Sequence, residues 1–91
     1  MDKKYKILLT DKAEHNLAKL PKNIATRILD KLEYFERSAN PFVYAKKLKD
    51  RKFGEYKFRI GDYRAIFDIN DHGELIILYI LLIGHRKDVY K

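Results

Sequence analysis

The spacing of apolar residues changes its period near Asn40, and this change constrains the fold more than any other feature of the chain. Before Asn40, apolar residues recur every three or four positions, as on one side of an α-helix. After it, apolar and polar residues alternate, as in a β-strand with one buried face. A chain of 91 residues is close to the usual size of one domain. We therefore expect residues 1–91 to form a single α+β domain.

Two helices are expected in the first half, after a short strand over residues 4–9. Asp11 and Glu14 fit the residue pair that opens a helix, and Pro21 ends this first helical run. A second helix is expected from about Lys22 to Arg37, before the break at Asn40-Pro41. Its apolar side holds Ile24, Ala25, Ile28, Leu29, Leu32 and Phe35. The two apolar stripes predict a helical hairpin with one side available for packing.

Three strands are expected in the second half, over residues 55–60, 63–69 and 75–83. Gly61-Asp62 fits a two-residue hairpin turn with glycine first, and residues 70–73 form a second turn. The last strand is nearly all apolar, which predicts cover on both of its faces. The order is therefore strand, helix, helix and three strands. It predicts a small antiparallel sheet with the N-terminal helical hairpin packed on one face.

Positive charge is unevenly distributed along the chain. Twenty basic and thirteen acidic residues give a net charge of +7, which suits a nucleic acid or an acidic protein partner, with general solubility as the alternative. Residues 46–64 alone hold eight basic residues against three acidic ones. Such clustering favours a binding face. The candidate RNA-binding residues in this segment are Lys46, Lys47, Lys49, Arg51 and Lys52.

A second group of residues offers the parts for phosphodiester chemistry. Alternation places Lys57 and Arg59 on one face of their strand, with Arg64 near them on the neighbouring strand. The segment after the last strand could deliver further side chains to one end of this face, namely His85, Arg86 and Tyr90. Cations hold a phosphate and stabilise its added charge, histidine exchanges protons near neutral pH, and an aromatic ring stacks on an unpaired base. A solvated basic sheet, a structural histidine and a frayed terminal tyrosine are the simpler alternatives.

Several classes of protein are disfavoured by composition. The chain has no cysteine and only three widely spaced histidines, so we expect neither a metal site nor a cofactor. Its longest apolar run is nine residues, about half of what spans a bilayer. The N-terminus carries no hydrophobic signal region. We therefore expect a cytoplasmic protein that does not interact with a membrane.

Two segments together resemble the RelE/ParE toxin superfamily: Gly-Glu-Tyr-Lys-Phe-Arg-Ile-Gly-Asp-Tyr-Arg at 54–64 and Gly-His-Arg-Lys-Asp-Val-Tyr at 84–90. Leu20-Pro21, the long second helix and Lys47-Leu48 extend the resemblance over nearly the whole chain. The RelE branch implies a ribosome-dependent endoribonuclease that cuts mRNA without a metal, by attack of the ribose 2′-oxygen. It also implies a co-expressed RelB-like antitoxin, so the implied partners are this antitoxin, the ribosome and mRNA.

The resemblance also implies roles for individual residues. Lys57 and Arg59 match the paired basic residues of the family's second strand, and Arg64 matches its phosphate-holding arginine. Arg86 matches the arginine proposed to protonate the leaving group. Tyr90 matches the tyrosine that orients or stacks on the substrate.

One position departs from the family pattern. Arg59 stands where the compared family member has a lysine proposed as general base. A guanidinium stays protonated and is a poor base. His85, next to Arg86, is then the candidate to accept the 2′-hydroxyl proton.

Two alternative functions remain open at this point. The ParE branch of the superfamily implies a toxin that is not a nuclease and inhibits DNA gyrase by binding it. The loss of the candidate lysine base also leaves room for an inactive basic module that binds RNA or the antitoxin. Lys57, Arg64, Arg86 and Tyr90 are all present, which favours the nuclease.

Overall fold

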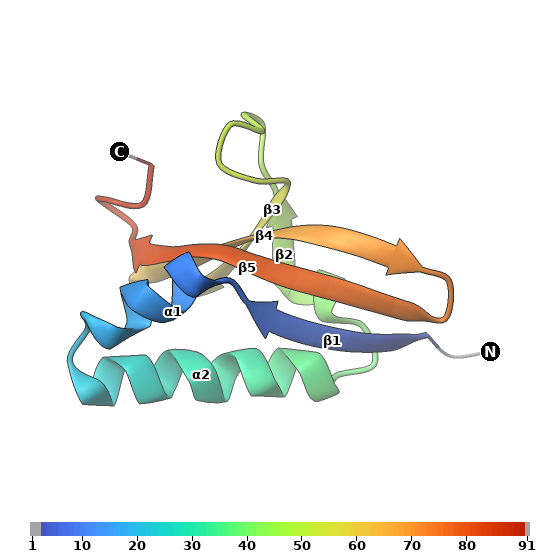
Figure 1. The fold of residues 1–91 in the computed structure, drawn as a ribbon, viewed down its shortest axis with the longest axis horizontal. Coiled ribbons are helices and arrows are strands. Elements are labelled where there is room, and N and C mark those ends of the chain that lie inside the picture. Colours follow the sequence, from blue (N-terminus) through green and yellow to red (C-terminus); the bar gives the residue numbers. More distant parts are fainter. Residues whose placement is uncertain (1–2, 91) are drawn as a thin grey trace.

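The computed structural model describes residues 3–90 and places two helices on one side of a five-stranded sheet (Figure 1). In chain order the elements are β1 (Lys4–Leu9), α1 (Asp11–Ala18), α2 (Lys22–Arg37), a 3₁₀ turn (Pro41–Tyr44), β2 (Ala45–Lys47), β3 (Tyr56–Ile60), β4 (Tyr63–His72) and β5 (Leu75–His85). The expected α+β class and helical hairpin are confirmed. No helix within residues 3–90 is long and apolar enough to cross a membrane.

The sheet is mixed, with the strand order β1-β5-β4-β3-β2. The β3–β4 and β4–β5 pairs are antiparallel, as expected, and so is the pair of β2 with β3, whereas β1 pairs parallel with β5. We expected a fully antiparallel sheet, so this parallel pair is a difference from the prediction. The sequence does not show it because β1 and β5 are far apart in the chain. No hairpin turn connects them, so no turn dictates their relative direction. Strand β2 was not expected, since its three residues are too few to show a pattern.

Helix α1 begins at a cap one residue earlier than the sequence suggests. The Thr10 side chain, rather than that of Asp11, accepts a hydrogen bond from the Ala13 backbone N–H at 3.2 Å. The same hydroxyl donates to the Ile80 carbonyl at 2.9 Å, which ties the start of α1 to β5. Asp11 and Glu14 lie in the first turn, where their charges interact favourably with the helix dipole.

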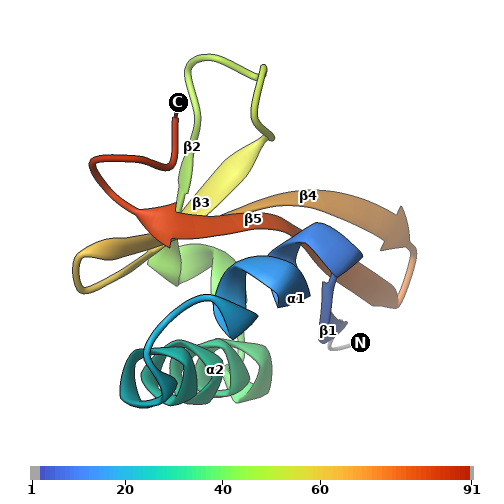
Figure 2. The ribbon, with the colours of Figure 1, turned by 60° about the vertical axis from the view of Figure 1, so that its left-hand side comes forward.

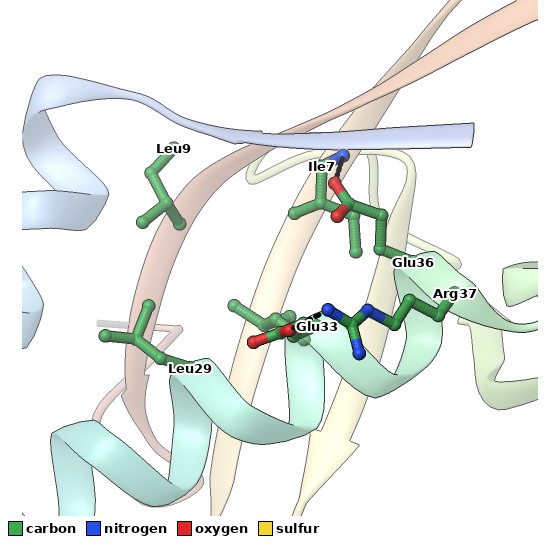
Figure 3. A pocket seen from close by; sticks show the side chains of 7 residues that line it. Ile7, Leu9, Leu29, Glu33, Glu36 and Arg37 are labelled. Carbon is green, nitrogen blue, oxygen red and sulfur yellow. Dashed lines mark hydrogen bonds and ion pairs between the residues drawn. The ribbon is translucent and has the colours of Figure 1, made fainter. Parts of the chain in front are cut away.

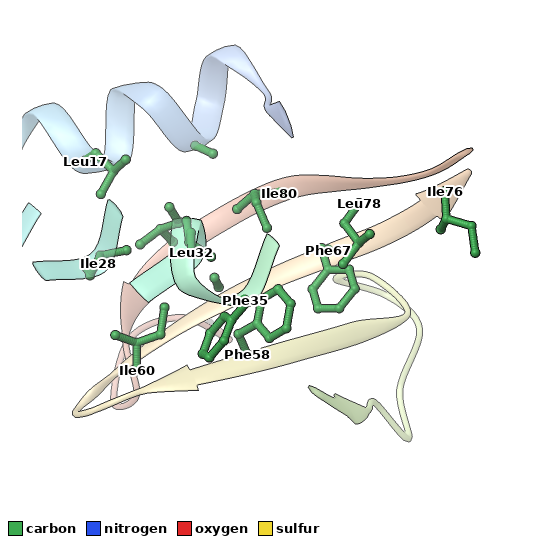
Figure 4. Close-up of a cluster of buried hydrophobic side chains, with 13 residues drawn as sticks. Leu17, Ile28, Leu32, Phe35, Phe58, Ile60, Phe67, Ile76, Leu78 and Ile80 are labelled. Carbon is green, nitrogen blue, oxygen red and sulfur yellow. The ribbon is translucent and has the colours of Figure 1, made fainter. Parts of the chain in front are cut away.

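The core fills the space between the helices and the sheet (Figure 4). Three aromatic rings stack through it: Phe35 of α2 on Phe58 at 4.6 Å between centroids, and Phe58 on Phe67 at 4.4 Å. All three are 2% exposed or less. Ile28 and Leu32 complete the buried stripe of α2 as expected, whereas Leu29 is 43% exposed at its margin.

The two faces of the sheet are covered unequally. On the helix side of β5, Ile76, Leu78 and Ile80 are buried, whereas Ile77 and Tyr79 on the other side are only partly buried. The expectation of full cover on both faces is therefore met on one face only. The loop between β2 and β3 and the C-terminal segment both lie over this second face, at one end of it (Figure 2). We call this second face the open face.

Candidate functional site

Strand register places four basic residues on the open face. Lys57 of β3 lies beside Lys46 of β2, and Arg59 lies beside Arg64 of β4. Side chains of directly paired residues share a face of the sheet. The alternate residue Phe58 points into the helix-side core, so these four side chains point away from the helices. The structure thus brings Lys57, Arg59 and Arg64 together as the sequence predicted.

Arg64 is the most buried member of this group. Its side chain donates two hydrogen bonds from one guanidinium nitrogen, to the Gly61 and Tyr63 carbonyls, each at 2.9 Å. Only 8% of the residue is exposed, and burial, followed by repulsion from Arg59, lowers the pKa of its guanidinium. The group stays protonated at neutral pH even so, because a guanidinium starts from a very high pKa. Arg64 is therefore a fixed positive charge in a defined orientation.

Further charges surround Arg64 at the tip of the β3–β4 hairpin. Arg86 adds a weaker repulsion that also lowers the pKa of Arg64, whereas Asp62 and Tyr90 oppose the shift. The Arg86 backbone N–H donates to the Asp62 carbonyl at 2.7 Å, and its Nε lies 3.8 Å from Asp62 Oδ1. The hairpin turn therefore holds Arg86 next to Arg64. We call Lys57, Arg59, Arg64, Arg86 and Tyr90 the cationic cluster.

Tyr90 is held in place although it lies close to the end of the chain. Its neighbour Val89 is 4% exposed and donates a backbone hydrogen bond to the His85 carbonyl at 2.9 Å. The Tyr90 ring lies 5.8 Å from Lys57 Nζ, a cation–π distance. Its other ring contact is Phe53, edge to face, with centroids 5.6 Å apart. The C-terminal turn thus places the aromatic ring of Tyr90 next to the basic residues of the cationic cluster.

A groove of about 640 Å³ adjoins Tyr90. It is lined by Lys46, Lys47, Leu48, Lys49, Asp50, Phe53, Lys57 and Tyr90. Three of the five predicted RNA-binding residues therefore lie in one groove with two members of the cationic cluster. The other two, Arg51 and Lys52, are exposed in the loop and do not line the groove. Sequence reasoning missed Phe53, although an aromatic residue within a run of lysines was a usable signal.

His85 lies on the opposite side of the sheet from Arg64, contrary to expectation. It pairs with Tyr63, whose ring packs against the helix-side core and meets the His85 ring edge to face at 5.4 Å. Arg64 pairs instead with Gly84. The His85 Nδ1 accepts a hydrogen bond from the Lys87 backbone N–H at 3.2 Å. The structure therefore separates His85 from the cationic cluster.

A register shift explains the position of His85. Consecutive residues Ile66 and Phe67 pair with Leu82 and Ile80, which leaves Leu81 as an extra residue in β5. Such a bulge shifts the alternation of every later residue by one position. Without the bulge, alternation from Ile80 would have placed His85 on the open face. With it, Gly84 takes that place.

A second pocket, of about 340 Å³, lies between β1 and α2 and offers different chemistry (Figure 3). The Glu36 carboxylate accepts the Ile7 backbone N–H at 2.7 Å, and Glu33 pairs with Arg37 at 2.8 Å. Its charged groups are thus largely engaged within the protein. Across residues 3–90, no three His, Cys, Asp or Glu side chains gather into a set that could hold a metal ion. The open face is therefore the candidate site.

The fold is similar to those of toxins solved in complex with their antitoxins. The RelBE2 toxin–antitoxin complex of Mycobacterium tuberculosis matches with a TM-score of 0.72 and 26% identity, over 91% of this chain and 99% of that chain. The RelB–RelE complex of Methanococcus jannaschii matches with a TM-score of 0.62 and 28% identity, over 92% and 95%. The RelE–RelB complex of Pyrococcus horikoshii OT3 matches with a TM-score of 0.60 and 25% identity, over 98% and 100%. The fold is thus of the RelE/ParE class.

The sequence assigns the family within this class. The family model described as the ParE toxin of the type II toxin–antitoxin system parDE matches residues 7–90, so the chain belongs to this family of toxins. Toxin RelG of Mycobacterium tuberculosis is 29% identical over 87 residues, which cover 96% of this chain and 97% of that protein. The resemblance stated from the sequence is confirmed at the level of the superfamily.

Proposed function

We propose that this toxin is a ribosome-dependent endoribonuclease that cuts mRNA on the open face of its sheet. The observation that carries the proposal is the arrangement of the cationic cluster around Arg64, with Tyr90 at its margin. A strand of RNA presents phosphate charges and unpaired bases. The three guanidinium groups and the lysine can bind the phosphates, and the aromatic ring can stack on a base.

The proposed reaction is an in-line attack of a ribose 2′-oxygen on the adjacent phosphorus. The bond from phosphorus to the 5′-oxygen of the next nucleotide breaks, which leaves a cyclic phosphate and a 5′-hydroxyl end. The 2′-hydroxyl gives its proton to water and the leaving oxygen takes one from water, so the step uses no net proton. Negative charge on the phosphoryl oxygens increases in the transition state, so fixed cations stabilise it more than the ground state.

The residues of the cluster take different parts in this reaction. Arg64, oriented by two carbonyls, holds the phosphate, with Lys57 and Arg59 beside it. Arg86, at the tip of the hairpin, neutralises charge on the leaving oxygen. Tyr90 stacks on a base or orients the strand. None of the three arginines serves as a proton acceptor, and His85 faces away, so the cluster acts by positioning RNA and stabilising charge.

We propose that the RNA strand continues from the cationic cluster into the lysine-lined groove. Lys46, Lys47 and Lys49 lie in the same groove as Lys57 and Tyr90, so we place the RNA backbone along these lysines. Each phosphate neutralised on a single strand lowers the slope of log affinity against log salt by about 0.7. Binding of mRNA in this groove should therefore weaken steeply as salt rises.

A RelB-like antitoxin is the proposed protein partner. Three structurally similar toxins are solved as complexes with antitoxins, and the net charge of +7 favours a partner with an acidic or amphipathic segment. Because the ribosome and mRNA are the targets, the proposed location is the cytoplasm. Co-expression with the product of the neighbouring gene should yield a complex and remove toxicity. Failure to co-purify, together with harmless expression of the toxin alone, would contradict the pairing.

Primer extension on mRNA from cells pulsed with the toxin tests the proposed reaction. We expect discrete cuts within translated frames, and none with a variant that carries both Lys57→Ala and Arg64→Ala. A second candidate function comes from the ParE family model that the chain matches, since ParE-like toxins inhibit DNA gyrase. A supercoiling assay with purified gyrase therefore runs beside the primer extension. If mRNA stays intact and supercoiling is blocked, the toxin is a gyrase inhibitor and the proposed nuclease activity is refuted.

A further inference from the structure

We propose that Phe53 and the groove beside it form a subsite for one unstacked nucleobase of single-stranded RNA. The inference rests on the proposed function in its choice of RNA as ligand. It adds a site that adjoins the cationic cluster, with which it shares Lys57 and Tyr90, and that extends onto the loop between β2 and β3. The groove contains two aromatic rings, Phe53 and Tyr90, and the Leu48 side chain among four lysines.

The loop is held in the position that presents Phe53 to the groove. Gly54, the next residue, has a φ of +153°, a conformation that residues with a side chain rarely adopt. A Cβ atom on Gly54 would lie 2.5 Å from Ile66 Cγ2, so the loop backbone rests directly on β4. The Glu55 backbone N–H donates to Asp68 Oδ1 of the same strand at 2.9 Å. The backbone that carries Phe53 is therefore anchored to β4 by the two residues that follow it.

The composition of the groove matches a nucleotide better than a phosphate alone. Lysines suffice to bind phosphates, whereas an aromatic and aliphatic wall adds affinity only for a ligand with an apolar face. Phe53 is partly buried and meets Tyr90 edge to face, with the ring centroids 5.6 Å apart, so two aromatic rings in contact line the groove. Asp50 is the acidic residue of the lining, and its carboxylate accepts the Lys52 backbone N–H at 2.9 Å.

Each ring also has an ammonium group near it. Lys52 Nζ lies 5.8 Å from the centroid of Phe53, and Lys57 Nζ lies 5.8 Å from that of Tyr90. A base that stacks on this wall places its own phosphates within reach of such lysines. The subsite thus combines a surface on which a base can stack with positive charges that attract the RNA phosphates.

Binding of short RNA to the purified full-length toxin tests the subsite. The probe is a set of 2′-O-methylated single-stranded oligoribonucleotides, each with the fluorescent base 2-aminopurine at one position. We expect quenching at one position when the wild-type protein binds. Base–aromatic stacking contributes about 1–3 kcal/mol, so Phe53→Ala should weaken binding about 5- to 150-fold. Phe53→Tyr should retain the affinity because it keeps the ring.

Tyr34→Ala is the matched control. Tyr34 is an exposed ring on α2 with Lys31 Nζ 5.2 Å from its centroid, but it lies outside the groove, so its loss should leave affinity unchanged. An oligonucleotide that lacks the base at the quenched position should bind the wild type as weakly as intact RNA binds Phe53→Ala. The Phe53→Ala variant should bind this oligonucleotide with the same affinity as it binds intact RNA.

The outcomes separate this inference from the proposed function. A wild type that cuts ribosome-bound mRNA but quenches at no position, or a Phe53→Ala variant that binds like wild type, would overturn the subsite alone. A wild type that quenches at one position but leaves ribosome-bound mRNA intact would retain the subsite and overturn the nuclease. Equal weakening by Tyr34→Ala would show that any exposed ring suffices and would also overturn the subsite.

Discussion

Replacement of Arg64 by alanine should abolish most of the activity while the protein stays folded. The change removes two hydrogen bonds from a charged group to the Gly61 and Tyr63 carbonyls, and such bonds contribute about 1.5–3 kcal/mol each. It also removes the cost of burying a charge beside Arg59 and Arg86, which offsets part of this loss. We expect a net loss of about 1–3 kcal/mol. Domains of this size are stable by about 5–14 kcal/mol, so the variant should remain folded.

The effect of Arg64→Ala on cleavage should be much larger than its effect on stability. Loss of one preoriented group that stabilises charge in a transition state costs about 10²–10³ in rate. Arg64→Lys should recover only part of the rate, because an ammonium cannot contact the two carbonyls and a phosphate in the same geometry. The assay is single-turnover cleavage of mRNA on programmed ribosomes, with a thermal melt of each variant to confirm folding.

Arg27→Ala is the control for net charge in this experiment. Arg27 is exposed on α2, on the helix side of the sheet, so its loss changes the charge by the same amount away from the cluster. We expect its cleavage rate to stay close to that of the wild type. Equal rate losses in Arg27→Ala and Arg64→Ala would show that total charge, and not the position of Arg64, governs the activity. A fully active Arg64→Ala would refute the assigned role outright.

Three further variants test other parts of the structure. His85→Ala should cleave RNA at nearly the wild-type rate in the single-turnover assay, because its ring faces away from Arg64; a hundredfold loss would restore it as general base. Gly54→Ala should lose about 1–3 kcal/mol of stability in urea unfolding, since its Cβ meets Ile66; an unchanged midpoint would contradict this packing. Phe58→Ala should lose about 3–5 kcal/mol, whereas a loss under 1 kcal/mol would mean that the stacked core is wrong.

Much of the cationic cluster follows from the sequence because strand alternation is a local property. Lys57 and Arg59 are two residues apart in one strand, and Gly61-Asp62 fixes a tight hairpin to the next. Arg64 must then lie opposite Arg59. The helix-side core is predictable for the same reason, since Phe58 occupies the alternate position and Phe35 falls on the apolar stripe of α2.

The placement of His85 shows where local alternation fails. Alternation along Ile76, Leu78 and Ile80 holds up to Leu81, where β5 gains an extra residue relative to β4. No glycine or proline marks that position, because the bulge arises from the pairing of two strands and not from the preference of one residue. A single inserted residue then reverses the face of everything that follows.

The sequence by itself determined the helices, the β3–β4 hairpin and the face on which Lys57, Arg59 and Arg64 lie. Each depends on residues a few positions apart, whose preferences act before the chain is compact. Only the tertiary structure decided the parallel pairing of β1 with β5, the face of His85 and the contact of Phe53 with Tyr90. These features join segments far apart in the chain, so they depend on which surfaces the whole fold brings together, and no local pattern encodes them.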